Sequence, residues 1–362
     1  MDTIDLLKDY MLIPAGSGYE SRMAYRLRDD FLRFTEDVNI DRIGNVIANF
    51  KCNESNPPRV MIFAHMDEIG FVVTKITSNG FLRLNKNGSV PDKIVPGLAL
   101  IIQTQEGNLI NGVVAEKSYH IMTDAEKFSV TPIPSLFVDI GVNSREDVTK
   151  LGIRVGDSVV YKPQFEKLQG SYVAGTSIDN RGGCVAMMLC AEAVSTACLK
   201  CDLFMVGSVQ EEHNMHGAMT AANMLKPDIA IALDICLAAD TPGLEEVFDA
   251  KTGNGPVINM YSFHGRGTLN GVIAHMGLAQ LVQKTAEKYS IKYSHFASRG
   301  LLTDATYVQN VGLGVATIDL GFPIKYAHSP YEVCNIEDIN LLGELCTKTI
   351  LEIDKDFSIK RY

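Results

Sequence analysis

The chain has 362 residues, of which 46% are apolar, 21% are charged and 8% are aromatic. This length predicts two domains or one large domain with an insertion, and the apolar content excludes a disordered protein. Lys and Arg number 33 against 43 Asp and Glu, which gives a formal net charge of −10. The acidic excess argues against nucleic acid or an anionic membrane as a partner, because basic patches supply the affinity for both.

The N-terminal residues, MDTID, show no basic segment followed by an apolar one, so we expect no signal peptide. No run approaches the ~18 apolar residues that a membrane-spanning helix needs. The one CxxC pair, Cys198 and Cys201, has no second pair beside it, and most of the other cysteines lie in apolar segments. We therefore predict a cytoplasmic protein with free thiols.

Hydrophobic spacing and turn residues outline the first part of the chain. A turn is expected at 14–18, a helix over 19–34 and a strand over 45–50. The apolar run RVMIFA (59–64) is typical of a buried strand.

The segment 69–163 differs in texture from the rest, because short β-rich runs alternate there with Gly, Asn, Pro and Asp. The expected strands are 71–76, 81–84, 99–104, 109–115 and 157–161, a spacing typical of a small β-barrel or sandwich. Beyond residue 170, helices are expected at 182–197, 217–224, 273–289 and 336–353, and strands at 203–209 and 229–233. The sequence thus predicts an α/β domain, formed by 1–68 and 164–362, with a β-rich domain inserted at 69–163.

Polar side chains follow three of the expected strands in the α/β domain. RVMIFA precedes His65 and Asp67, LFMVGSVQ precedes Glu211 and Glu212, and IAIAL precedes Asp234. Ligands of open α/β sheets bind outside the carboxyl ends of the strands, so we expect these side chains to meet in one crevice.

Two further elements complete the candidate site. Asp179 lies in SIDNRGG just before a helix, and His328 follows a turn in KYAHSP. Imidazoles and carboxylates together suit Zn²⁺, with cobalt or manganese as substitutes. One carboxylate can bridge two metals ~3.5–4 Å apart, where a shared water loses a proton near neutral pH.

Additional carboxylates could then support the chemistry. A carboxylate outside the ligand set can move the proton of that water. Asp67, two residues after His65 on an extended chain, lies on the side from which it can hold the other imidazole nitrogen. Each residue alone has an ordinary alternative role: a packed histidine, a solvated Glu-Glu pair, or, for Asp179, a helix N-cap. The prediction depends on all five motifs occurring together.

Together these motifs resemble the M42 family of metallo-aminopeptidases, the glutamyl, leucyl and deblocking aminopeptidases with tetrahedral assemblies. The resemblance rests on AHMDEIGFVV (64–73), SIDNRGG (177–183), VQEEHNMHGA (209–218), ALDICLAADTPG (232–243), LLTDA (301–305) and KYAHSPYE (325–332). In the insertion it extends to SLFVDIG (135–141) and LGIRVGDSVV (151–160). It implies an α/β/α sandwich zinc-peptidase domain and an inserted β domain that mediates dimers, commonly built into twelve-subunit shells.

The resemblance also implies the site assignments. Two divalent ions per subunit, zinc or else cobalt or manganese, would share Asp179 as a bridge. One ion would be held by His65, Asp179 and Asp234, and the other by Asp179, Glu212 and His328. Glu211 would be the general base acting on the bridging water, and Asp67 would orient His65.

The sequence departs from the family pattern near the expected substrate side. Lys325 stands where the family has Arg, and it keeps the charge but loses the bidentate geometry. Leu301 and Leu302 replace a glycine-rich approach, and His213 and His216 replace apolar and basic residues. None of these changes affects an expected ligand, but they leave the preferred N-terminal residue open.

We therefore expect a cytoplasmic aminopeptidase that acts on peptides and self-associates as a dimer or as larger assemblies up to a dodecamer. The same metal centre could instead hydrolyse N-acyl amino acids or other amides. A glycosidase using Glu211 and Glu212 would leave the histidines idle. A non-enzymatic self-assembling shell with a structural metal would have no use for the extra carboxylate of Glu211.

Overall fold

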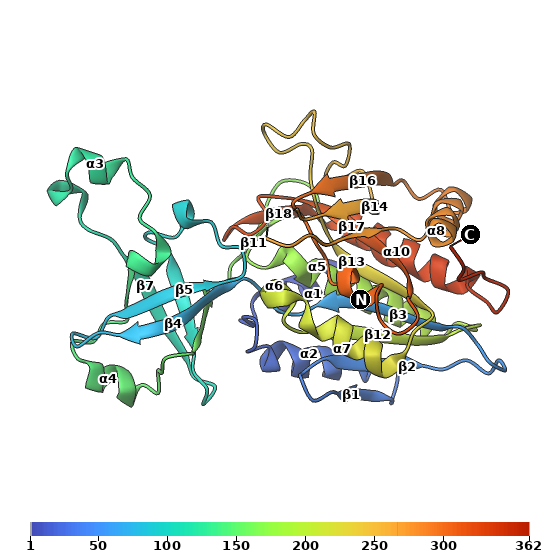
Figure 1. The fold of residues 1–362 in the computed structure, drawn as a ribbon, viewed down its shortest axis with the longest axis horizontal. Helices are drawn as coiled ribbons and strands as arrows, with labels where there is room; N and C mark the ends of the chain where they lie inside the picture. The colour runs from blue at the N-terminus through green and yellow to red at the C-terminus, as the bar shows by residue number, and fades with distance from the viewer. Residues whose placement is uncertain (1, 266, 362) are drawn as a thin grey trace.

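The computed structural model describes residues 2–265 and 267–361. It has two lobes, a larger lobe of helices packed on a sheet and a smaller lobe formed by a closed β-barrel (Figure 1). The expectation of an α/β fold with an inserted barrel or sandwich is confirmed. No helix among the described residues is long and apolar enough to span a membrane.

The large lobe is organised around a twelve-stranded mixed sheet. Its main path runs through β1 (Val38–Ile40), β2 (Val46–Phe50), β12 (Asp202–Ser208), β3 (Arg59–His65), β13 (Ile229–Leu237), β17 (Ala316–Lys325), β18 (Glu332–Asn335), β11 (Tyr172–Gly175) and β10 (Phe165–Lys167). The central strands β12, β3, β13 and β17 are parallel, so their carboxyl ends lie at one edge. A branch adds β14 (Val257–Phe263) antiparallel to β17, and β14 also pairs with β15 (Gly271–Ile273) and β16 (Ser294–Arg299).

Helices cover both faces of this sheet. One core joins the sheet to α1 (Thr3–Met11), α2 (Ser21–Phe31), α5 (Ile178–Val194), α8 (Met276–Lys288) and α10 (Ile336–Glu352). The opposite core joins it to α7 (His216–Leu225) and α9 (Ala305–Val308). In β3, Val60 and Ile62 enter the first core and Met61 and Phe63 the second, as the alternation of strand side chains requires. The result is an α/β/α sandwich.

The small lobe closes its six strands in the order β4-β5-β8-β7-β6-β9. These are β4 (Gly70–Ile76), β5 (Leu82–Asn87), β6 (Ala99–Gln103), β7 (Leu109–Ala115), β8 (Phe137–Asp139) and β9 (Ser158–Tyr161). Short helices connect them, namely η1 (Asp92–Ile94), η2 (Tyr119–Ile121), α3 (Asp124–Lys127), η3 (Ile133–Ser135) and α4 (Arg145–Lys150). The barrel has its own buried core, which includes Phe71, Leu100 and Val159.

Two element boundaries differ from the sequence-based expectation, those of β13 and α8, whereas the start of α5 agrees with it. Strand β13 continues to Leu237, so Asp234 lies within the strand, paired with Gly321 of β17, and not beyond its end. Although α5 spans Ile178–Val194, Asp179 (φ −77°, ψ 105°) and Asn180 (φ −123°, ψ 41°) are not helical, so the regular helix begins after them, close to the expected residue 182. The helix expected from residue 273 begins at Met276, because the preceding residues form β15.

Candidate active site

The structure brings the expected ligand residues together at the carboxyl edge of the parallel strands. His65 ends β3, and its Nε2 lies 3.2 Å from Asp179 Oδ1 and 3.8 Å from Asp234 Oδ1. His328 Nε2 lies 3.5 Å from Asp179 Oδ2 and 3.5 Å from Glu212 Oε1. The two oxygens of Asp179 therefore face two different imidazoles.

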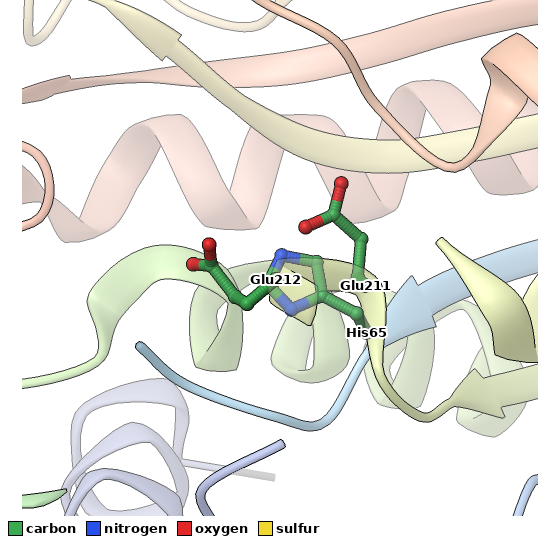
Figure 2. Close-up of side chains that lie close together, drawn as sticks. All are labelled: His65, Glu211 and Glu212. Carbon is green, nitrogen blue, oxygen red and sulfur yellow. The ribbon is translucent and has the colours of Figure 1, made fainter. Parts of the chain in front are cut away.

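The side chains group as a pair of metal sites would require. Within each of two trios the potential ligand atoms lie within 4.8 Å of one another: His65, Asp179 and Asp234, and Asp179, Glu212 and His328. Asp179 belongs to both trios. A third group joins His65 to Glu211 and Glu212, and Figure 2 shows the imidazole between the two carboxylates.

Glu211 and Glu212 are positioned by the start of the short helix α6 (Glu211–Asn214). The preceding residue, Gln210, has a left-handed φ of 57°, which turns the chain sharply after β12. The backbone N–H groups of both glutamates donate to the carboxylate of Asp67, each at 3.0 Å. Ser17 Oγ donates to the same carboxylate.

Asp67 also contacts His65, but more closely through its backbone. His65 Nδ1 lies 3.2 Å from the backbone oxygen of Asp67 and 3.6 Å from its Oδ1. The other imidazole nitrogen, Nε2, faces Asp179. Asp67 therefore fixes both the ring of His65 and the start of α6, without belonging to any metal-capable group found among the described residues.

Burial of several carboxylates in one place opposes their ionisation. Burial, with Asp234 and Glu212 nearby, raises the pKa of Glu211 well above its usual value. Burial and the charge of Asp179 likewise raise the pKa of Asp234 well above its usual value. The same two causes raise the pKa of Glu212 to about 7, although the charge of His328 opposes the shift.

The imidazoles show the complementary effect. Burial alone would lower the pKa of His328, but the charges of Glu212 and Asp179 raise it to about 10. For His65, hydrogen bonds to Asp179 and Asp67 outweigh burial and raise the pKa well above its usual value. A buried cluster with more carboxylates than imidazoles fits divalent cations, which would offset the repulsion that raises these pKa values.

The residues that depart from the family pattern lie outside the metal-capable groups. Nδ1 of His213 lies 2.8 Å from Asn87 Oδ1. Lys325 Nζ forms an ion pair with Asp240 Oδ2 at 2.7 Å.

His216, Leu301 and Leu302 also lie outside those groups. His216 Nδ1 lies 3.0 Å from the side chain of Gln210. Leu301 and Leu302 line the cavity of about 200 Å³ that adjoins the cluster.

Several buried acids that hold the site were not assigned roles from the sequence. Glu332 accepts hydrogen bonds from the backbone N–H groups of Asp179, at 3.0 Å, and His328, at 2.7 Å. Glu68 accepts from Ala15 N at 2.7 Å and from Ser177 Oγ. Both acids lie inside the motifs AHMDEIG and KYAHSPYE. A charged residue among residues expected to be buried indicates a role in holding the site, so the sequence could have identified both.

The sandwich, the inserted barrel and the cluster of imidazoles and carboxylates define the class of metal-dependent peptidases. Residues 44–345 match the model of the M42 glutamyl aminopeptidase family, and the chain belongs to this family. The resemblance inferred from the motifs is thus confirmed.

Individual relatives agree with this membership. The chain is 34% identical to a putative aminopeptidase, SgcX, of Escherichia coli over 89% of this chain and 86% of the relative. Its fold is similar to that of aminopeptidase APDkam598 from Desulfurococcus kamchatkensis, with a TM-score of 0.91 and 31% identity over 99% and 96% of the two chains. It is also similar to the Pyrococcus horikoshii TET1 peptidase, described as assembling into a tetrahedron or a large octahedral shell, with a TM-score of 0.83 and 32% identity over 97% and 100% of the chains.

Proposed function

We propose that this protein is an aminopeptidase that removes N-terminal residues from peptides at a two-metal centre. The observation that carries the proposal is the position of Asp179, whose two oxygens face His65 on one side and His328 on the other. A carboxylate placed in this way is suited to bridge two cations.

The residues divide into ligands and a proton carrier. His65, Asp179 and Asp234 would hold one ion, and Asp179, Glu212 and His328 the other. Two divalent ions, zinc or else cobalt or manganese, would supply a Lewis acid for the scissile carbonyl and a water that ionises near neutral pH.

Glu211 is left as the general base. It is buried, it lines the cavity, and it belongs to neither of the trios that share Asp179. Its raised pKa suits a group that takes a proton from the attacking water and returns it to the leaving amine.

The test separates proton transfer from metal binding. Glu211→Gln should retain both metals but lower kcat about 10²–10⁴-fold, because the amide cannot accept the proton. Asp179→Asn should lose metal, as measured by elemental analysis. The exposed Glu287 of α8 provides the control, since Glu287→Gln should change neither property. A near-normal rate in Glu211→Gln would contradict the proposal, as would faster hydrolysis of N-acetylated amino acids than of free N-termini.

We also propose that the inserted domain, 69–163, mediates self-association. Its segment around α3 projects from the barrel (Figure 1) and exposes large apolar side chains: Tyr119 is 67% exposed, Ile121 68% and Phe128 89%. The TET1 relative is described as forming a tetrahedron or a large octahedral shell, and a related structure as a dodecamer, which supports self-association of this chain, from a dimer up to a dodecamer. Light scattering should give a multiple of the 39.7 kDa subunit mass, and Phe128→Ser should reduce it. A monomer at micromolar concentration would contradict this.

A further inference from the structure

Beyond the metal-capable residues, the cavity is lined by neutral polar side chains of two paired strands. Asn259 and Ser262 come from β14 and Ser298 from β16. The side chains of Phe296 and Leu301 add apolar lining. The same cavity is lined by the residues proposed to hold the metals and by Glu211, so a peptide bound there would place its N-terminal side chain within reach of these strands.

Ser262 and Ser298 face each other across the parallel pairing of β14 with β16. The two residues are only 2% and 5% exposed, and neither Oγ has a hydrogen-bond partner. Buried hydroxyls in native structures are nearly always hydrogen-bonded, because leaving one unpaired costs free energy. Both residues line the cavity although their oxygens are covered in this conformation, so a rotation of either side chain would present its hydroxyl to a polar group of a ligand.

Asn259 adds an acceptor with a fixed orientation. Its Nδ2 donates to Asp319 Oδ2 at 3.0 Å, and its Oδ1 is buried without a partner. The hydrogen bond to Asp319 prevents the amide from turning over, so an oxygen is left for a donor. A shift in register between Asn259 and Tyr261 allows Asn259 and Ser262, three residues apart, to line the same cavity.

The lining of the cavity offers little charge with which a charged side chain of a substrate could pair. Among the described residues around the cavity there is no Lys or Arg, and the carboxylates are those of the metal cluster. His264 also lines the cavity, and its Nδ1 accepts the backbone N–H of Gly267 at 3.0 Å. A charged side chain would lose its hydration there without gaining a dedicated counter-charge, which is costly.

We propose that this cavity selects peptides whose N-terminal residue carries an uncharged hydrogen-bonding side chain, an amide or a hydroxyl. The side chain would donate to Asn259 Oδ1 and exchange hydrogen bonds with Ser262 and Ser298. This inference rests on the proposed aminopeptidase function and adds the substrate class.

Isosteric substrate pairs test the selectivity. Aminoacyl-4-nitroanilides of Thr and Val, Asn and Leu, and Gln and Glu differ mainly in hydrogen bonding or charge. With the metal-loaded wild-type protein, the first member of each pair should have a kcat/KM at least about tenfold higher, because a site built to hydrogen-bond a substrate rejects an analogue that lacks the group.

Variants of the two serines test which residues recognise the side chain of the substrate's N-terminal residue. Ser262→Ala and Ser298→Ala should each lower the Thr-to-Val ratio of kcat/KM about fivefold, which corresponds to the loss of one hydrogen bond. Ser294→Ala is the matched control, since Ser294 lies on β16 but outside the lining of the cavity. It should leave the ratio unchanged.

The outcomes separate the two proposals. Equal rates within every pair, with hydrolysis intact, would overturn the selectivity and leave the aminopeptidase function standing. A Thr-to-Val ratio unaffected by either serine variant would also overturn the selectivity. No hydrolysis of any nitroanilide would overturn the aminopeptidase function, and the selectivity with it.

Discussion

The backbone N–H of Glu211 donates to Oδ1 of Asp67 at 3.0 Å, which ties the loop after β3 to the start of α6. The neighbouring N–H, that of Glu212, donates to the other oxygen of the same carboxylate at the same distance. One buried side chain therefore fixes the backbone of the proposed base and of a proposed ligand. Asp67 is accordingly a positioning residue.

Replacing Asp67 by Asn should lower kcat/KM about 10–100-fold, because the amide keeps one acceptor and places a donor against the second N–H. The effect should be largest on kcat, since Glu211 loses its alignment. Steady-state kinetics with a free-N-terminal peptide, together with metal analysis, measure it.

Asp338 provides a matched control for this substitution. Its carboxylate also accepts two backbone N–H groups, from Gly253 and Gly255 at 2.7 Å each, but it lies outside the cavity. Asp338→Asn should affect stability more than turnover. If Asp67→Asn lost no more activity than Asp338→Asn, the positioning role would be wrong.

Glu332 holds two proposed ligands through their backbones, since it accepts from Asp179 and His328. Glu332→Gln should weaken metal affinity about 10–100-fold, as substitutions that disturb the support of metal ligands do. Competition with a chelator measures this affinity. Glu337→Gln, on the exposed side of α10, should leave it unchanged. Equal affinities in the two variants would contradict the role of Glu332.

The sequence could predict that the proposed ligands lie together, because several of them occupy positions with a simple physical signature. His65 ends β3 and Glu212 follows β12, and parallel strands bring their carboxyl ends to one edge. The apolar run before Asp234 predicts its position in the crevice but also predicts that the strand ends before it. The strand continues through Asp234, because backbone pairing does not stop where a polar residue ends the apolar run.

The supporting contacts were not predictable in the same way. Glu332 is 153 residues from Asp179, and no local pattern indicates a hydrogen bond across that distance. The facing of Ser262 and Ser298 likewise follows from the pairing of two strands that the periodicity did not reveal. Strand β17 was missed as well, because Asp319, Gly321 and Pro323 interrupt its apolar residues although the strand is buried.

Metal binding should stabilise the protein more at high pH than at low pH. Without metal, burial raises the folded-state pKa of Glu212 to about 7 against an ordinary 4.5, so the folded state loses stability as pH rises from about 4.5 to about 7. The pKa of His328 is about 10 against 6.5, so its contribution falls at still higher pH. A divalent cation displaces these protons, and its binding therefore strengthens as pH rises.

The difference in Tm between metal-loaded and chelator-treated protein should accordingly grow from pH 5.5 to pH 8. At a free metal concentration one hundred times the Kd, the stabilisation should be about 2.7 kcal/mol. Asp179→Ala is the control, since a protein without the bridging carboxylate should show little metal-dependent change. A difference in Tm that shrinks with rising pH would contradict the proposed ligands.

The close packing of α5 on β17 offers a last test, because it involves Gly182 just after Asp179. A Cβ at this position would overlap the fully buried ring of Phe322. Gly182→Ala should lower the free energy of unfolding by about 1–3 kcal/mol, the usual cost of overpacking a core. Because the start of the regular helix must shift to relieve the overlap, the non-helical segment that carries Asp179 should move with it and metal affinity should fall too.

Gly277→Ala in α8 is the matched control: its Cβ would meet His275 at 3.4 Å, an ordinary contact, so stability should be unchanged or slightly raised. Urea denaturation of both variants measures the difference, and equal midpoints would show that α5 can accommodate the methyl group without moving.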